Sequence, residues 1–180
     1  MRWLLKQCDA NLAGLSLPKP FSIPALVTSI EESRGRSIQL TPVDDHEGDL
    51  RTACGLRVRQ NSVTYVLYRP RPTPHQTEHT ILHMLAHEWL DHGTGLASDS
   101  APYELPESFR QTMGAESATR QVVHAQSPYE SAEEREAELS AYLIKRRVQA
   151  STAGTDLISR LESSLSYPLG PQRRRMLQGR

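Results

Sequence analysis

Histidine recurs at every fourth residue from His79 through His83 to His87, and this row constrains the fold more than any other feature. On an α-helix each residue advances about 100°, so neighbouring members of the row lie about 40° apart on one face. Asp91 continues the row, while the other side of the helix is apolar: Ile81, Leu82, Leu85, Trp89 and Leu90. Lysine and glutamate usually fill a solvated helix face. Three histidines therefore favour a metal-binding helix over a plain polar one.

A third ligand is expected from another helix, because metal sites of this kind take three or four protein ligands. Glu134 and Glu138 share one face, at i, i+4 spacing, on a helix predicted to begin after Ser131. One of them could bind the metal while the other accepts the ring N–H of a ligating histidine. The simpler reading is an acidic first turn that interacts favourably with the helix dipole. Glu136 points about 180° away from the midpoint of the other two and ranks last as a ligand.

Met84 departs from the pattern of a zinc peptidase. In the motif H-E-x-x-H, the glutamate after the first histidine activates water held by the metal. Residues 83–87 read H-M-L-A-H, and methionine cannot transfer a proton. Glu88 and Asp91 are the nearby candidates for a replacement catalytic base, although both are less well placed on the helix than position 84. Loss of such a base typically removes about two to four powers of ten in rate. We therefore expect zinc (Zn2+) binding with absent or impaired peptidase activity.

At this point the chain resembles the ImmA/IrrE-like zinc metallopeptidases, most strongly their actinobacterial branch. Residues 79–87 read H-T-I-L-H-M-L-A-H, with His92 five positions on, and the family pattern is H-x-I-L-H-E-L-[GA]-H. Residues 134–138 read E-R-E-A-E, with Ala141 three further, which is similar to the second motif, E-x-E-A-[DNE]-x-x-A. Three shorter segments also fit, at 17–21, 34–36 and 54–56, so the likeness covers about residues 1–150.

The resemblance implies a small α+β domain that holds zinc through His83, His87 and an acidic residue. Glu134 is the first choice for that acid, with Glu138 as a second-shell residue or alternative ligand. Because family members cut or regulate repressors, the resemblance also implies a repressor-like protein or peptide partner. The expected function is a regulatory protein with impaired or absent peptidase activity. The alternative is an active zinc endopeptidase that cleaves a repressor or antitoxin-like protein. A third reading is a purely structural domain without metal.

Local patterns predict an α+β fold: a small three-stranded antiparallel sheet packed on a zincin-like pair of helices, with additional N- and C-terminal helices. Helices are expected at about 2–12, 22–35, 77–91, 131–150 and 156–165, and strands at about 38–43, 56–59 and 63–68. Glycine at position 93 is expected to end the metal-binding helix. Residues 94–129 are expected to form a long connection with a weak helical patch at 107–113. Residues 1–150 would form the metallopeptidase domain, and 151–180 a C-terminal helix and basic tail.

Composition excludes several other classes. The chain has 180 residues with 21 Lys+Arg and 21 Asp+Glu, so no overall field favours nucleic acid or an acidic membrane. Its two cysteines, Cys8 and Cys54, do not make a disulfide framework. The charged N-terminus does not resemble a signal peptide, and no apolar run approaches a membrane span. The expected location is the cytoplasm, and nothing in the sequence indicates an oligomeric state.

Overall fold

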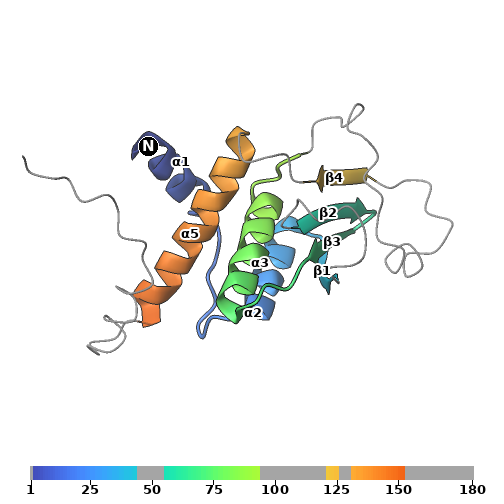
Figure 1. Ribbon diagram of the computed structural model, residues 1–180. Coiled ribbons are helices and arrows are strands. Elements are labelled where there is room, and N and C mark those ends of the chain that lie inside the picture. Colours follow the sequence, from blue (N-terminus) through green and yellow to red (C-terminus); the bar gives the residue numbers. More distant parts are fainter. Residues whose placement is uncertain (1, 44–54, 94–120, 126–130, 153–180) are drawn as a thin grey trace, which may run out of the picture. The chain divides into compact units, whose positions relative to one another are not determined.

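A computed structural model describes residues 2–43, 55–93, 121–125 and 131–152 (Figure 1). The elements in chain order are α1 (Arg2–Asn11), α2 (Ile23–Arg34), β1 (Ser37–Pro42), β2 (Gly55–Gln60), β3 (Val63–Tyr68), α3 (Pro74–Trp89), β4 (Gln121–Ala125) and α5 (Ala132–Thr152). This content confirms the predicted α+β class. Residues 1–145 form one compact unit and 146–180 a second, of which the end of α5 is described. The predicted helix at 156–165, the helical patch at 107–113 and Cys54 lie outside the described residues.

The described strands form one mixed sheet in the order β1-β3-β2-β4. The hairpin of β2 and β3 is confirmed, and its turn includes Asn61 with a left-handed φ of 52°. The prediction of an antiparallel three-stranded sheet is wrong, because β1 pairs with β3 in parallel, with Ser37 opposite Val63. β4 adds a fourth strand against β2, within the stretch predicted as a long, weakly structured connection. Residue alternation identifies a strand, but it does not choose the partner or direction of a strand joined through a long connection.

Capping residues set the ends of the helices. Ser22 and Gly35 bound α2 as predicted, and the Ser131 hydroxyl accepts the Glu134 backbone N–H at 3.0 Å, as predicted for α5. Helix α3 begins earlier than predicted, because Thr73 is its N-cap and proline suits the first helical turn. It also ends before the predicted glycine stop, because Asp91 already has a left-handed φ of 56°.

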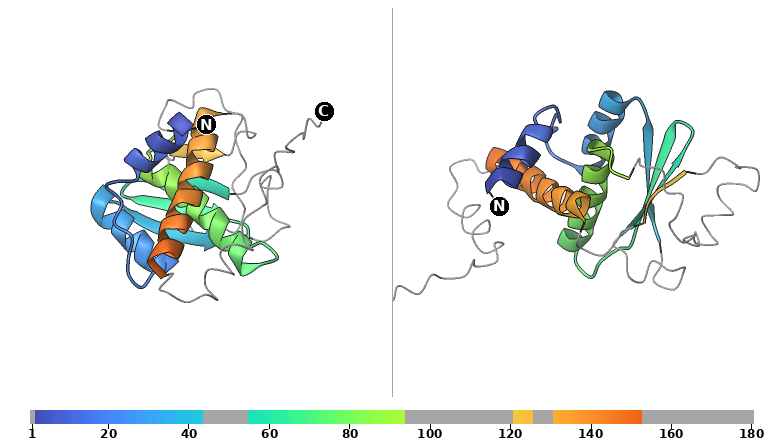
Figure 2. Two further views of the ribbon diagram at one scale, coloured as in Figure 1. Left: turned by 90° about the vertical axis from the view of Figure 1, so that its left-hand side faces the viewer. Right: turned by 90° about the horizontal axis from the view of Figure 1, so that it is seen from above.

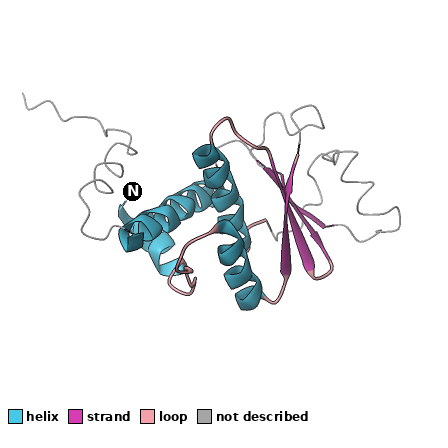
Figure 3. Ribbon diagram, turned by 90° about the horizontal axis from the view of Figure 1, so that it is seen from below, coloured by secondary structure: helices cyan, strands magenta, loops and turns pink. Residues whose placement is uncertain are grey.

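The elements within residues 2–145 lie in layers (Figures 2 and 3). Helices α2 and α3 cover one face of the sheet, and α1 and the first part of α5 lie on the other side of α3. Helix α3 is therefore central, and all its residues from Thr80 to Trp89 are buried. His83 and His87 consequently face another helix rather than solvent, whereas His79 is partly exposed.

Candidate metal site

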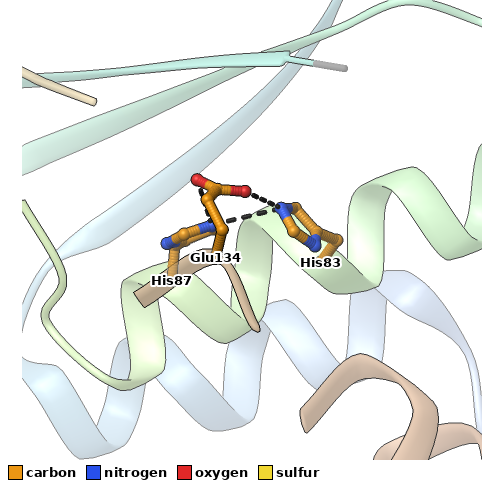
Figure 4. A group of neighbouring side chains, drawn as sticks. All are labelled: His83, His87 and Glu134. Atoms are coloured by element: carbon orange, nitrogen blue, oxygen red, sulfur yellow. Dashed lines mark hydrogen bonds and ion pairs between the residues drawn. The ribbon is translucent and has the colours of Figure 1, made fainter. Parts of the chain in front are cut away.

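Two histidines of α3 and one glutamate of α5 converge on a common point (Figure 4). His83 Nε2 lies 3.1 Å from His87 Nε2. Glu134 Oε2 lies 3.3 Å from His83 Nε2, and its other oxygen, Oε1, lies 3.3 Å from His87 Nε2. Glu134 is in the first turn of α5, so the cap at Ser131 fixes the backbone that carries it. Among the described residues, these three form a group that could hold a metal ion.

The spacing of the two imidazole nitrogens fits a small divalent ion. A tetrahedral ion with bonds of about 2.0–2.1 Å holds its ligand atoms roughly 3.3 Å apart. The two imidazole nitrogens are 3.1 Å apart, close to that value, and each lies 3.3 Å from a different oxygen of Glu134. With one ligand atom taken from each residue, the three atoms lie within 4.8 Å of one another. All three residues are buried, with 6%, 0% and 3% of His83, His87 and Glu134 exposed. Two imidazoles and one carboxylate leave a further coordination position open, so the group can support either a structural or a Lewis-acid role.

Glu138 holds the other side of the His83 ring. Its Oε2 lies 3.2 Å from His83 Nδ1, and its Oε1 lies 3.0 Å from His79 Nε2. Of the two predicted acids, the structure thus places Glu134 at the converging nitrogens and Glu138 behind His83. Hydrogen bonds with His79 and His83 hold the pKa of the Glu138 carboxyl well below its usual range.

The carboxylates also make His83 a stronger base. Burial by itself lowers the pKa of His83, but the hydrogen bonds and negative charges of Glu134 and Glu138 outweigh this effect. Together they raise the pKa to about 9 when no metal is bound. A metal ion must therefore displace a proton from His83 at neutral pH.

His92 and Glu136 were not predicted as site residues, yet both lie behind His87. His92 Nδ1 is 3.0 Å from His87 Nδ1, and His92 Nε2 is 3.4 Å from Glu136 Oε2. The sequence signal for His92 was its place in the family pattern. Glu136 ranked last because only its direction relative to the metal was considered.

Glu88 and Asp91, the predicted replacement bases, are both paired with arginine side chains. Glu88 Oε1 accepts the Thr64 hydroxyl at 3.1 Å, and its Oε2 lies 3.2 Å from Arg57 Nη1 and 3.1 Å from Arg59 Nη2. Asp91 Oδ1 lies 2.6 Å from Arg59 Nη2. Neither acid belongs to the group of three. Their catalytic role stays a prediction, and these contacts give it no support.

Met84 packs against the start of β2. Only 1% of this residue is exposed. A Cβ built on Gly55 would lie 3.0 Å from Met84 Sδ, so the sulfur sits directly over the glycine backbone. Position 84 therefore contributes apolar packing between helix and sheet.

Comparison with known proteins gives no match. No family model matches the chain, and neither a curated protein nor a solved structure is significantly similar to it. The resemblance to ImmA/IrrE-like peptidases thus depends on the residues of its motifs. In the part of the chain that the structure describes, no helix combines the length and apolar character needed to cross a membrane.

Proposed function

We propose that the chain is a zinc-binding regulatory protein with a metallopeptidase-type pair of helices and little or no peptidase activity. The observation that carries this proposal is the convergence of His83, His87 and Glu134 beside a buried methionine at position 84. Two buried imidazoles and a buried carboxylate form a donor set that suits zinc. Bound zinc would supply Lewis acidity and would join α3 to α5.

The surroundings of Met84 support the non-catalytic half of the proposal. A general base must come within hydrogen-bond distance of the proton it removes. Met84 has no group that accepts a proton, and it packs over Gly55. Glu88 and Asp91 contact arginine side chains, which compete for their oxygens. Glu138 is already shared between two histidines.

An open pocket beside the first half of α3 supports binding of a protein or peptide partner. It has a volume of about 510 Å³ and is lined by Arg71, Pro72, His75, Gln76, His79 and Thr80. This volume is in the range of ligand pockets, roughly 300–1,000 Å³. His79 connects the cavity to the site, because its partner Glu138 also contacts His83. We propose that a peptide segment of a repressor-like partner occupies this cavity.

Metal analysis and calorimetric titration with zinc test the binding half of the proposal. We expect about one zinc per chain, since the described residues offer one three-ligand group. Both His83→Ala and Glu134→Gln should abolish tight binding. The matched controls are His75→Ala, an exposed histidine of the same helix, and Glu133→Gln, an exposed neighbour of Glu134. Binding that survives both site substitutions would exclude this site.

A protease assay with zinc-loaded protein and fluorescently labelled casein tests the catalytic half. The natural chain should release no zinc-dependent fluorescence, whereas Met84→Glu should gain some cleavage because it restores the missing carboxylate. Cleavage by the natural chain that disappears in His83→Ala would instead support the alternative, an active endopeptidase. Glu88→Ala would then show whether that residue acts as the base.

A further inference from the structure

A chain of polar contacts runs from the metal-binding group back to helix α1. His87 Nδ1 lies 3.0 Å from His92 Nδ1, and His92 Nε2 lies 3.4 Å from Glu136 Oε2. The other Glu136 oxygen accepts a hydrogen bond from Asn11 Nδ2 at 2.7 Å. These contacts connect α1, the end of α3 and α5 on the side of His87 that faces away from Glu134.

The backbone at the end of α3 explains why His92 reaches His87. Asp91 adopts the left-handed conformation that reverses the chain after a helix. The His92 N–H then donates to the His87 carbonyl at 3.1 Å, and the Asp91 N–H donates to the Glu88 carbonyl at 3.3 Å. These two bonds form a Schellman motif. The Arg57 guanidinium also donates to the His92 carbonyl, so His92 is fixed from the sheet side as well.

The contacts fix where each ring proton must lie. His87 can bind a metal through Nε2 only if that nitrogen is unprotonated, so its proton is on Nδ1. Two ring nitrogens 3.0 Å apart share one proton, so His92 Nδ1 accepts it. A neutral His92 then carries its own proton on Nε2, where it can donate to Glu136.

We infer that His92 and Glu136 are positioning residues that hold His87 in the metal-binding tautomer and orientation. This inference rests on the proposed metal site. Glu138 has the corresponding place behind His83, so each ligating histidine has its own partner on the far ring nitrogen. The contacts of His87 with His92 and of His92 with Glu136 form what we call the His87 relay. It differs from the Glu138 contact because a second imidazole lies between the ligating ring and the carboxylate. Outer-shell partners of this kind typically change metal affinity by about 10–100-fold when removed.

Substitution of His92 is the direct test. His92→Ala should weaken zinc affinity by about 10–100-fold with the stoichiometry unchanged. His92→Asn should recover most of the affinity, because its side-chain oxygen can accept the His87 Nδ1 proton from nearly the same position. Glu136→Ala should weaken binding less than His92→Ala, while Glu32→Ala, an exposed control on α2, should leave it unchanged. Wild-type affinity in His92→Ala, or equal loss in His92→Asn and His92→Ala, would overturn the inference.

Long-range proton–nitrogen NMR spectra of the metal-free protein supply a second readout that does not need zinc. They should show His87 protonated on Nδ1 and His92 on Nε2, and His92→Ala should allow the other His87 tautomer to appear. If no variant binds zinc but the tautomers behave as expected, the proposed function fails and the relay stands. If His87 keeps the same tautomer in His92→Ala, the relay is excluded even when zinc binds.

Discussion

Glu88 and Arg57 form an ion pair that is almost completely buried between α3 and β2. Their Oε2 and Nη1 atoms are 3.2 Å apart, and their side chains are 1% and 0% exposed. Arg59 and Thr64 contact the same carboxylate. Glu88 therefore attaches α3 to the sheet, and the arginines compensate its negative charge.

Replacing Glu88 should destabilise the fold without removing the metal site. Loss of one partner of a buried ion pair typically costs about 3–5 kcal/mol, because the remaining charge is left buried and unpaired. Glu88→Ala should therefore lower the free energy of unfolding, measured by urea denaturation, by an amount in this range. Zinc affinity of the folded protein should change little. Glu32→Ala, at an exposed position of α2, is the control and should have little effect. An unchanged stability would show that the pair is not structurally important.

Asp91 should affect the stability of the fold through its left-handed backbone conformation and its contact with Arg59. A non-glycine residue in the left-handed conformation costs roughly 1–2 kcal/mol, and Asp and Asn tolerate it best. We expect Asp91→Ala to destabilise the protein by about that amount and Asp91→Asn by less. Asp91→Gly relieves the backbone but loses the 2.6 Å contact to Arg59, so it should lie between the two. Thermal denaturation measures the order, and equal effects of Ala and Asn would contradict it.

The correct fold predictions came from local features of the sequence, the capping and turn residues that lie within a few positions of the element they bound. Ser22 and Gly35 bound α2, Asn61 lies in the hairpin turn, and Ser131 caps α5. The direction of β1 and the presence of β4 depend on pairing between distant segments, which residue alternation does not encode.

The candidate site shows the same division between local and distant information. The four-residue spacing placed His83 and His87 together on α3, as the structure shows. Glu134 and Glu138 could not be separated, since i, i+4 spacing puts both on one face and the crossing of α3 and α5 decides which reaches the nitrogens. Glu136 was ranked last from its direction on the helix, yet it contacts His92 because the left-handed Asp91 turns the chain back.

Zinc affinity should increase with pH across the neutral range. In the metal-free protein the pKa of His83 is raised to about 9, so below that pH zinc competes with a proton for the ring. From pH 6.5 to about 9 the affinity should rise by about tenfold per unit and then level off. Calorimetry in two buffers of different ionisation enthalpy should detect about one proton released per zinc at neutral pH. Binding without proton release would contradict the raised pKa.

The stability of the metal-free protein should decrease as the pH rises, whereas its zinc affinity increases. The folded pKa of His83 lies above its ordinary value of 6.5, so the charged ring stabilises the native state. This contribution is fully present below about pH 6.5 and is lost as the pH rises through about 9. Urea denaturation in a chelator should show the decline, and His83→Ala should flatten it. The same decline in both proteins would assign it to another group.

Gly55 and Met84 should behave as a coupled pair at the contact between β2 and α3. A Cβ on Gly55 would lie 2.8 Å from the Leu67 carbonyl oxygen and 3.0 Å from Met84 Sδ. Overpacking of this kind typically costs about 1–3 kcal/mol, so Gly55→Ala should lower the free energy of unfolding by about that amount. Met84→Ala removes the flexible obstacle but leaves the backbone oxygen, so the double variant should be more stable than the sum of the single effects implies, with rescue only in part. A double-mutant cycle by urea denaturation measures this coupling. Strict additivity would mean that Met84 does not pack over the glycine, and the account of position 84 as a packing residue would then fail.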